Sequence, residues 1–294
     1  MISEADVESY RENGYLVVPD ILSEVEIARV RAAIDEMVEA SRTITEHTDV
    51  YDLEDDHSAA TPRVRRVKTP HKWHDAFADL IAHEKLLDVL EQLIGPGIRF
   101  DTSKLNIKDA SGGSAVEWHQ DWAFYPHTND DLCAVGFMID DMDLENGPLM
   151  MLPGSHRGPI YDHHVDGVFC GAINDPACDS EYASAVPLTG AAGSVSIHHV
   201  RMVHGSTQNQ ADRPRRLLLH QYRAADSWPM ALMPKDWQSY EDQLLRGEPT
   251  LEPRLEKVPV RLPFPAAINQ GSIYENQRAT KSASLLDSQR RQAT

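Results

Sequence analysis

The chain has 294 residues, of which 41% are hydrophobic and 25% charged, and a formal net charge of -18. This acidity argues against non-specific nucleic-acid binding, which needs a basic face for phosphate contacts. The sequence has neither the roughly 18 consecutive apolar residues that cross a bilayer nor the basic start and apolar stretch of a secretory signal, so we expect a cytoplasmic protein without membrane or nucleic-acid partners.

The first 97 residues are predicted to form a mainly helical support. The expected elements are helices over 4–13, 23–40 and 74–93 and a strand over 14–18. Ser23 is a plausible N-cap, and Glu26 three residues later would complete a capping box. Residues 41–62 are polar and acidic with no clear period, so we expect a loop there.

Four cations in six residues mark the stretch from Arg63 to Lys68, within an otherwise acidic chain. Charge runs are often simply exposed on a solvated strand. An anion-binding site is the alternative, and these cations, together with Arg223, could contact an anionic group on a substrate. The sequence leaves both interpretations open.

Short alternating or apolar runs separated by Gly, Pro, Asn and Asp begin at about Ile98. This pattern is typical of antiparallel β structure. The expected strands cover 99–105, 115–121, 133–139, 149–152, 194–199 and 215–222. We therefore predict one domain over 1–294, mainly β with α. It consists of a double-stranded β-helix (jelly-roll, cupin-like) core over 98–228, N-terminal helices that brace it, and a C-terminal extension over 229–294 with a helix at 237–246.

His119 and Asp121 stand two residues apart in a predicted strand. Residues i and i+2 of a strand point to the same side, about 6.6 to 7 Å apart, so an imidazole and a carboxylate can converge on one ion. An open iron centre with two histidines and one carboxylate needs a second histidine. His204 follows an apolar run and is the candidate.

Arg215 lies eleven residues after His204, where the returning strand is predicted to begin. A guanidinium near a metal can hold a carboxylate through two parallel hydrogen bonds. Because neighbouring residues of a strand point to opposite faces, Arg215 and Arg216 cannot both face His204. Alternation alone leaves open which of the two does so.

The chain resembles the phytanoyl-CoA dioxygenase family over nearly its whole length. The matching segments, in order, are Asn13-Gly-Tyr-Leu-Val-Val-Pro19, His119-Gln-Asp121, Leu144-Glu-Asn-Gly-Pro148, Leu152-Pro-Gly-Ser-His156, His204-Gly-Ser206 and then Arg215. The resemblance implies a jelly-roll oxygenase that uses Fe(II), 2-oxoglutarate and dioxygen. The implied metal ligands are His119, Asp121 and His204.

The same resemblance implies how the co-substrate is bound. Arg215, assisted by Ser206, would hold the distal carboxylate of 2-oxoglutarate. Lys108 would contact the co-substrate as well, although nearby Lys104 competes for that role.

Other side chains around the predicted ligands have two interpretations each. The aromatic residues Trp118, Trp122, Phe124 and Tyr125 could line a substrate pocket or pack in the core. His198, His199 and His220 could orient a metal ligand, or could be packed or exposed histidines without such a role.

The reaction expected from the resemblance is hydroxylation of an unactivated C–H bond of a small-molecule metabolite, with release of succinate and carbon dioxide. Two other classes of function remain open. A His, Asp and His set also suits zinc in a hydrolase or isomerase, and a jelly roll can be a binding protein without catalysis. A dicarboxylate clamp at Arg215 and Ser206 favours the oxygenase, because neither alternative needs one.

Overall fold

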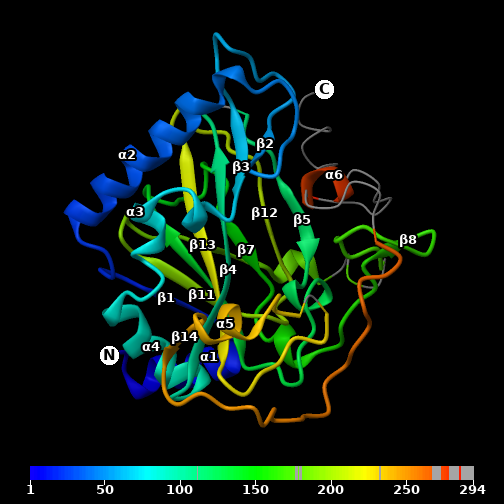
Figure 1. Ribbon diagram of the computed structural model, residues 1–294. Helices are drawn as coiled ribbons and strands as arrows, with labels where there is room; N and C mark the ends of the chain where they lie inside the picture. Colours follow the sequence, from blue (N-terminus) through cyan, green and yellow to red (C-terminus); the bar gives the residue numbers. More distant parts are fainter. Residues whose placement is uncertain are drawn as a thin grey trace.

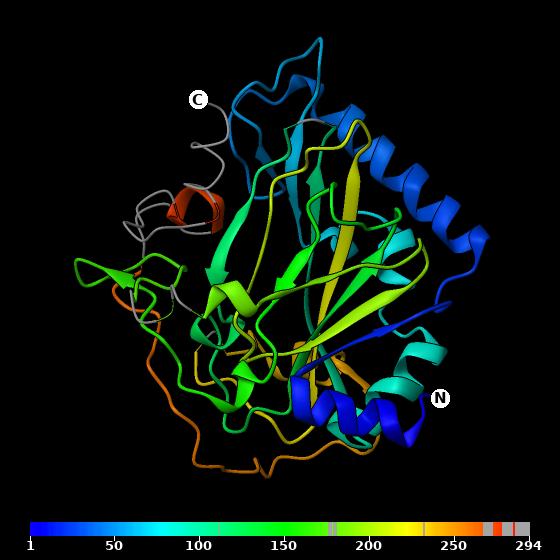
Figure 2. The ribbon, with the colours of Figure 1, turned by 180° about the vertical axis from the view of Figure 1, so that it is seen from behind.

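Two antiparallel β-sheets form the centre of the molecule, and helices cover one face of the larger sheet (Figures 1 and 2). The computed structural model describes residues 1–110, 112–175, 178, 181–231, 233–266, 273–277 and 285. Within these ranges no helix is both long enough and apolar enough to cross a membrane. The mainly β jelly-roll core with N-terminal helices is as predicted, although the sheets do not close into a barrel.

The larger sheet takes strands from both halves of the chain. In spatial order it contains β1 (Tyr15–Val18), β11 (Val195–His199), β6 (Leu132–Met138), β13 (Arg215–Ala224), β4 (Ile98–Lys108), β3 (Val64–Lys68) and β2 (Tyr51–Leu53), with β14 (Leu244–Arg246) also paired to β4. The smaller sheet contains β10 (Val186–Leu188), β7 (Leu149–Met151), β12 (His204–Ser206) and β5 (Val116–His119). A separate hairpin joins β8 (His164–Val165) to β9 (Val168–Phe169).

The helices are distributed unevenly along the chain. They are α1 (Glu4–Asn13), α2 (Glu24–Ala40), α3 (Asp75–Ala78), α4 (Glu84–Ile94), α5 (Trp237–Glu241) and α6 (Ile273–Gln277). Helix α2 runs along the outside of the larger sheet, whereas α6 lies beside β5 of the smaller one (Figures 1 and 2).

Side-chain alternation in β13 separates two hydrophobic cores. Leu218 belongs to the core between the larger sheet and the helices. Leu217 and Leu219 belong to the core between the two sheets, where they join Leu149 and Met151 of the smaller sheet. Arg215, two positions before Leu217, lies on the same face of β13 and therefore points into the space between the sheets.

The N-terminal elements closely follow the sequence. Helix α1 has the predicted bounds, and Ser23 caps α2 in a capping box in which the Ser23 N–H donates to Glu26 Oε2 at 2.8 Å. The predicted loop over 41–62 is wrong in two details, because it begins with a 3-10 helix, Ser41–Thr43, and contains the short strand β2.

Two predicted helices are shorter than expected. The helix over 74–93 breaks into α3 and α4, since an unbroken helix would put Glu84 on the same apolar stripe as Phe77 and Leu80. The helix predicted over 237–246 ends at α5, and the chain then extends as β14 to add a strand beside β4.

The strand predicted over 115–121 ends at His119. Asp121 begins a 3-10 turn, Asp121–Ala123, so it does not share a strand face with His119 as the sequence suggested. Pairing to β12 stops there, because His204 is the last partner of β5. The two side chains still converge, by a turn of the backbone rather than by strand alternation.

We expect Leu218→Ala to lower the free energy of unfolding by about 2 to 5 kcal/mol, because truncation leaves a cavity in a closely packed core. Leu218 is fully buried, whereas Leu262 is 41% exposed. The matched control Leu262→Ala should change stability by no more than about 0.5 kcal/mol. Urea unfolding of the two variants measures the difference, and equal midpoints would contradict this assignment of the core.

Candidate active site

A buried group of two histidines and one aspartate lies between the sheets. His119 ends β5 and His204 begins β12, and the two are direct partners in the antiparallel pairing. Asp121 enters from the 3-10 turn that follows β5. One potential ligand atom from each residue lies within 4.8 Å of the others. The structure thus brings together the three ligands that the sequence predicted.

Backbone carbonyls fix the orientation of both imidazoles. His119 Nδ1 lies 2.7 Å from the carbonyl oxygen of Glu117, and His204 Nδ1 lies 3.0 Å from that of Met202. Because a carbonyl only accepts hydrogen bonds, each Nδ1 carries the hydrogen and each Nε2 keeps its lone pair. This is the tautomer that a metal ligand needs.

The charge states also suit a divalent ion. Burial lowers the pKa of His119 to about 4 and holds the pKa of His204 well below its usual range, so both are neutral at pH 7. Burial alone raises the pKa of Asp121. The Lys104 ammonium at 3.7 Å, together with His198 and the two ligand histidines, nevertheless keeps that pKa well below its usual value. One carboxylate and two neutral imidazoles match an iron centre with open coordination positions.

Arg215 points into a small cavity of about 30 Å³ that is also lined by His119, His204 and Ser206. Its Nε and Nη2 donate to the carbonyl oxygen of Gly147 at 3.1 and 2.7 Å. Its Nη1 is buried and has no hydrogen-bond partner in the described part of the chain. Burial lowers the Arg215 pKa only to about 10, so the guanidinium is protonated at pH 7. Its Nη1 can therefore donate a hydrogen bond to an anionic acceptor in the small cavity.

The neighbouring arginines face elsewhere. Arg216 donates to Asp140 through Nε and Nη2 at 2.9 and 2.7 Å. Arg213 pairs with Asp143. The strand register therefore selects Arg215 as the arginine of this site.

The two lysines of β4 have different surroundings. Lys108 Nζ donates to Ser206 Oγ at 2.8 Å and to the carbonyl oxygen of Thr207, so it holds Ser206 in place. Lys104 instead lines the small cavity and a larger one, and lies close to Asp121. This geometry favours Lys104 for direct contact with a ligand and gives Lys108 a supporting position.

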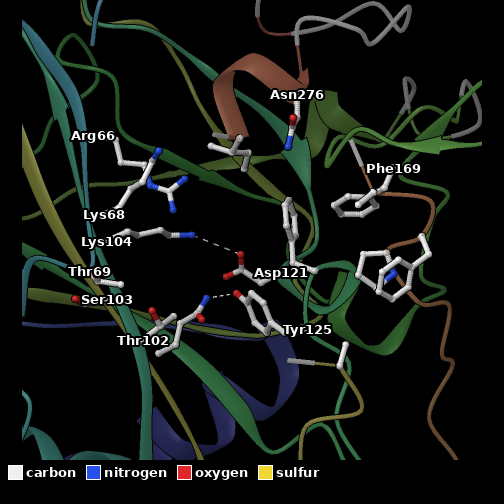
Figure 3. Close-up of a pocket in the computed structure, with 17 residues that line it drawn as sticks. Arg66, Lys68, Thr69, Thr102, Ser103, Lys104, Asp121, Tyr125, Phe169 and Asn276 are labelled. Atoms are coloured by element: carbon white, nitrogen blue, oxygen red, sulfur yellow. Dashed lines mark hydrogen bonds and ion pairs between the residues drawn. The ribbon is translucent and has the colours of Figure 1, made fainter. Parts of the chain in front are cut away.

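The larger cavity, of about 410 Å³, opens beside Asp121 (Figure 3). Of the predicted aromatic cluster, only Phe124 and Tyr125 line it. Trp118 stacks on Tyr182 with ring centroids 4.5 Å apart, and Trp122 packs in a separate buried cluster. Two of the four predicted aromatic residues therefore line the cavity, and the two tryptophans pack in the protein interior.

Three further histidines were considered from the sequence, and only one lies near the metal group. His198 Nε2 is 3.5 Å from Asp121 Oδ2. His199 lies against His156, and His220 packs against Phe100 on the helical side of the larger sheet.

The C-terminal extension contributes to the site, which sequence reasoning missed. Ile273 of α6 lines both cavities, and Phe264 and Asn276 line the larger one. Helix α6 is held by Gln277, whose side chain accepts the Glu117 N–H at 2.9 Å. The proline-rich and charged composition of this extension carries no signal for such a role.

The sequence profile of phytanoyl-CoA dioxygenase matches residues 10–217. The chain belongs to the phytanoyl-CoA dioxygenase family. It is 38% identical over 276 residues to a "Probable alpha-ketoglutarate-dependent hypophosphite dioxygenase" of Stutzerimonas stutzeri. The aligned region covers 92% of this chain and 95% of the relative. It is 28% identical over 240 residues to an L-proline trans-4-hydroxylase of Streptomyces griseoviridis, covering 75% of this chain and 86% of the relative.

Among solved structures, EctD from S. alaskensis with 2-oxoglutarate and 5-hydroxyectoine is similar, with a TM-score of 0.65 and 25% identity over 85% of this chain and 86% of that chain. The same protein with bound Fe also has a TM-score of 0.65, and covers 86% of this chain and 87% of that chain. Family membership, together with the buried His-Asp-His group, makes this dioxygenase an iron- and 2-oxoglutarate-dependent enzyme.

We expect Arg215→Ala to weaken 2-oxoglutarate binding by roughly 30-fold to several thousandfold, since truncating one partner of a buried charged pair commonly costs about 2 to 5 kcal/mol. Arg215→Lys should restore only part of this affinity, because an ammonium cannot make two parallel hydrogen bonds.

Arg216→Ala is the matched control and should leave the affinity nearly unchanged, because Arg216 already pairs with Asp140. The dissociation constant of 2-oxoglutarate, measured anaerobically with Fe(II), decides between the two arginines. The opposite ranking would mean that Arg216, not Arg215, binds the co-substrate.

Proposed function

We propose that this dioxygenase hydroxylates an unactivated C–H bond of a small-molecule metabolite and converts 2-oxoglutarate to succinate and carbon dioxide. The observation that supports this proposal most directly is the unpartnered Nη1 of Arg215 in the cavity beside the His-Asp-His group. A buried donor without a partner is costly unless a ligand supplies the acceptor. A dicarboxylate whose other end lies at a metal would do so.

Each residue then has a defined task. His119, Asp121 and His204 would hold Fe(II), which together with 2-oxoglutarate and dioxygen supplies the oxidising chemistry. Arg215 and Ser206 would hold the distal carboxylate, and Lys108 fixes the Ser206 hydroxyl.

The larger cavity is where a substrate would bind. It borders Asp121, whereas the small cavity borders His119 and His204, and Lys104 and Ile273 line both cavities. A substrate there would lie next to Asp121 and would contact Phe264 and the α6 residues Ile273 and Asn276. Asn276 is seen at the cavity in Figure 3. The relatives support a small molecule, since they are named for hypophosphite, proline and ectoine.

A zinc hydrolase and a non-catalytic binding protein are the competing classes. Anaerobic addition of Fe(II) and 2-oxoglutarate separates them from the dioxygenase: we expect a visible charge-transfer band with Fe(II) and none with Zn(II). Admission of air should then produce succinate. A protein that binds Zn(II) and 2-oxoglutarate but forms neither the band nor succinate with Fe(II) is not this enzyme.

We also expect His119→Ala, Asp121→Ala and His204→Ala each to abolish turnover, because an open site with only two protein ligands holds iron poorly. Iron content and succinate formation measure the effect. His74→Asn is the control, since His74 caps α3 away from the site and asparagine also caps helices well. Near-normal iron content and activity in any one alanine variant would remove that residue from the metal site.

A further inference from the structure

Basic side chains form one wall of the larger cavity. Arg66 and Lys68 stand two apart in β3, so they share a face of the sheet. Their partners in β4 are Asn106 and Lys104. Figure 3 shows the Arg66 guanidinium reaching from this wall into the cavity, with Phe169 on the opposite side.

Most cations of the 63–68 stretch already have anionic partners. Arg63 Nε lies 3.0 Å from Asp109. Arg65 Nε lies 3.0 Å from Glu54. These two arginines therefore stabilise the surrounding loops and do not face the cavity.

Lys68 and Arg223, which were also considered for the anion site, have protein partners as well. Lys68 Nζ lies 2.9 Å from Asp52, so only Arg66 remains to be explained in the 63–68 stretch. Arg223 is fully buried and donates to the carbonyl oxygen of Ser227.

The side chain of Arg66 has neither an ion pair nor a hydrogen bond with any residue that the structure describes. Its Nε is buried without a partner. Arginine stays protonated at physiological pH, and leaving such a group half-buried and unpaired is unfavourable. The arrangement is the same as at Arg215: a charged donor is directed into a cavity that borders the metal group.

The charges of the co-substrate side do not neutralise Arg66. The formal charges of iron(II), Asp121 and dianionic 2-oxoglutarate leave one negative charge, and Arg215 balances it. Asp121 is already counted in this sum, so it does not also balance the ammonium of Lys104, which lies 3.7 Å away. The positive charges of Arg66 and Lys104 are thus both left for a substrate.

Another part of the cavity wall is apolar, and the cavity is roomy. Phe124, Phe169 and Phe264 line it together with Pro263 and Ile273, and its volume is about 410 Å³. A bare inorganic oxyanion would fill only a small part of this space and would leave the aromatic walls without contact. The cavity fits a molecule that combines an anionic group with a hydrocarbon portion.

We propose that the substrate is a small organic oxyanion, a phosphonate or carboxylate on a short carbon skeleton, whose anionic group is held by Arg66. This assignment rests on the proposed function, because it places the carbon skeleton between the Arg66 wall and the metal group. Arg66 is then a specificity-determining residue, and the apolar wall orients the C–H bond to be oxidised.

The test uses the Fe(II)-loaded protein with 2-oxoglutarate and probes that share one tail: butylphosphonate, butyrate, 1-butanol and butylamine, with hypophosphite as the inorganic arm. Succinate formation above the rate without substrate, and a shift of the anaerobic charge-transfer band, report binding at the metal. We expect at least one butyl oxyanion to give both signals, and the alcohol and the amine to give neither. The two oxyanions distinguish a phosphonate from a carboxylate substrate.

Arg66→Gln should raise the KM of the active oxyanion by roughly 30-fold or more, and Arg66→Lys should recover part of it. Uncoupled 2-oxoglutarate turnover and the band itself should persist in both variants, which shows that they are folded. Arg63→Gln is the matched control, because Arg63 is an arginine three residues away that pairs with Asp56 and Asp109, and its KM should be unchanged.

Several results would overturn the assignment. They are a response to the alcohol or amine equal to that of the oxyanions, an unchanged KM in Arg66→Gln, no response to any butyl oxyanion at millimolar concentration, and a response to hypophosphite alone. If the wild-type protein forms the band and uncoupled succinate while the oxyanions fail, only the substrate class is wrong. If band and succinate are both missing, the proposed function fails first.

Discussion

The antiparallel pairing of β5 with β12 is the constraint on which the site depends. It sets His119 directly opposite His204, although 84 positions separate them in the chain, and puts their ring centroids 4.1 Å apart. Asp121 follows β5 closely enough to turn back toward the same point. A shift of one residue in this pairing would turn one imidazole to the other face of the sheet, and the three ligand side chains would no longer converge.

Several positively charged side chains lie between the sheets, where they can bind anionic ligands. The inner faces of β3, β4 and β13 carry Arg66, Lys104, Lys108 and Arg215, in a protein whose net charge is -18. Lys104 has an acidic neighbour in Asp121 at 3.7 Å. Arg215 and Arg66 each keep a donor without a partner among the described residues, Arg215 at the small cavity and Arg66 at the larger one. Under the proposed function, the small cavity would hold the co-substrate and the larger one the substrate.

The C-terminal extension completes the enclosure that the two sheets leave open. Helix α6 lies beside β5, where Gln277 bonds to the backbone of both Glu117 and Gly171. Ile273 thereby reaches both cavities. An apolar wall beside the metal group lowers the local dielectric and would strengthen the electrostatic interactions of a bound ion.

The sequence by itself determined the elements whose signals are local. The capping box of Ser23 and Glu26 predicted the start of α2, and alternation gave most strands of the larger sheet. The order of matched segments identified the family, which the comparisons confirmed. The same resemblance, not the strand pattern, singled out Arg215, which the structure places beside the metal group.

Tertiary structure decided what depends on contacts between distant residues. Whether Lys104 or Lys108 faces the cavities, and which cation of the 63–68 stretch lacks a counter-charge, follows from partners such as Asp121, Ser206 and Asp52, which lie far away in sequence. The break before α4 and the turn at Asp121 also result from packing, because periodicity describes one element at a time. No local sequence pattern predicts that α6 lines the cavities, since this role depends on the contact of α6 with β5, which is far away in the sequence.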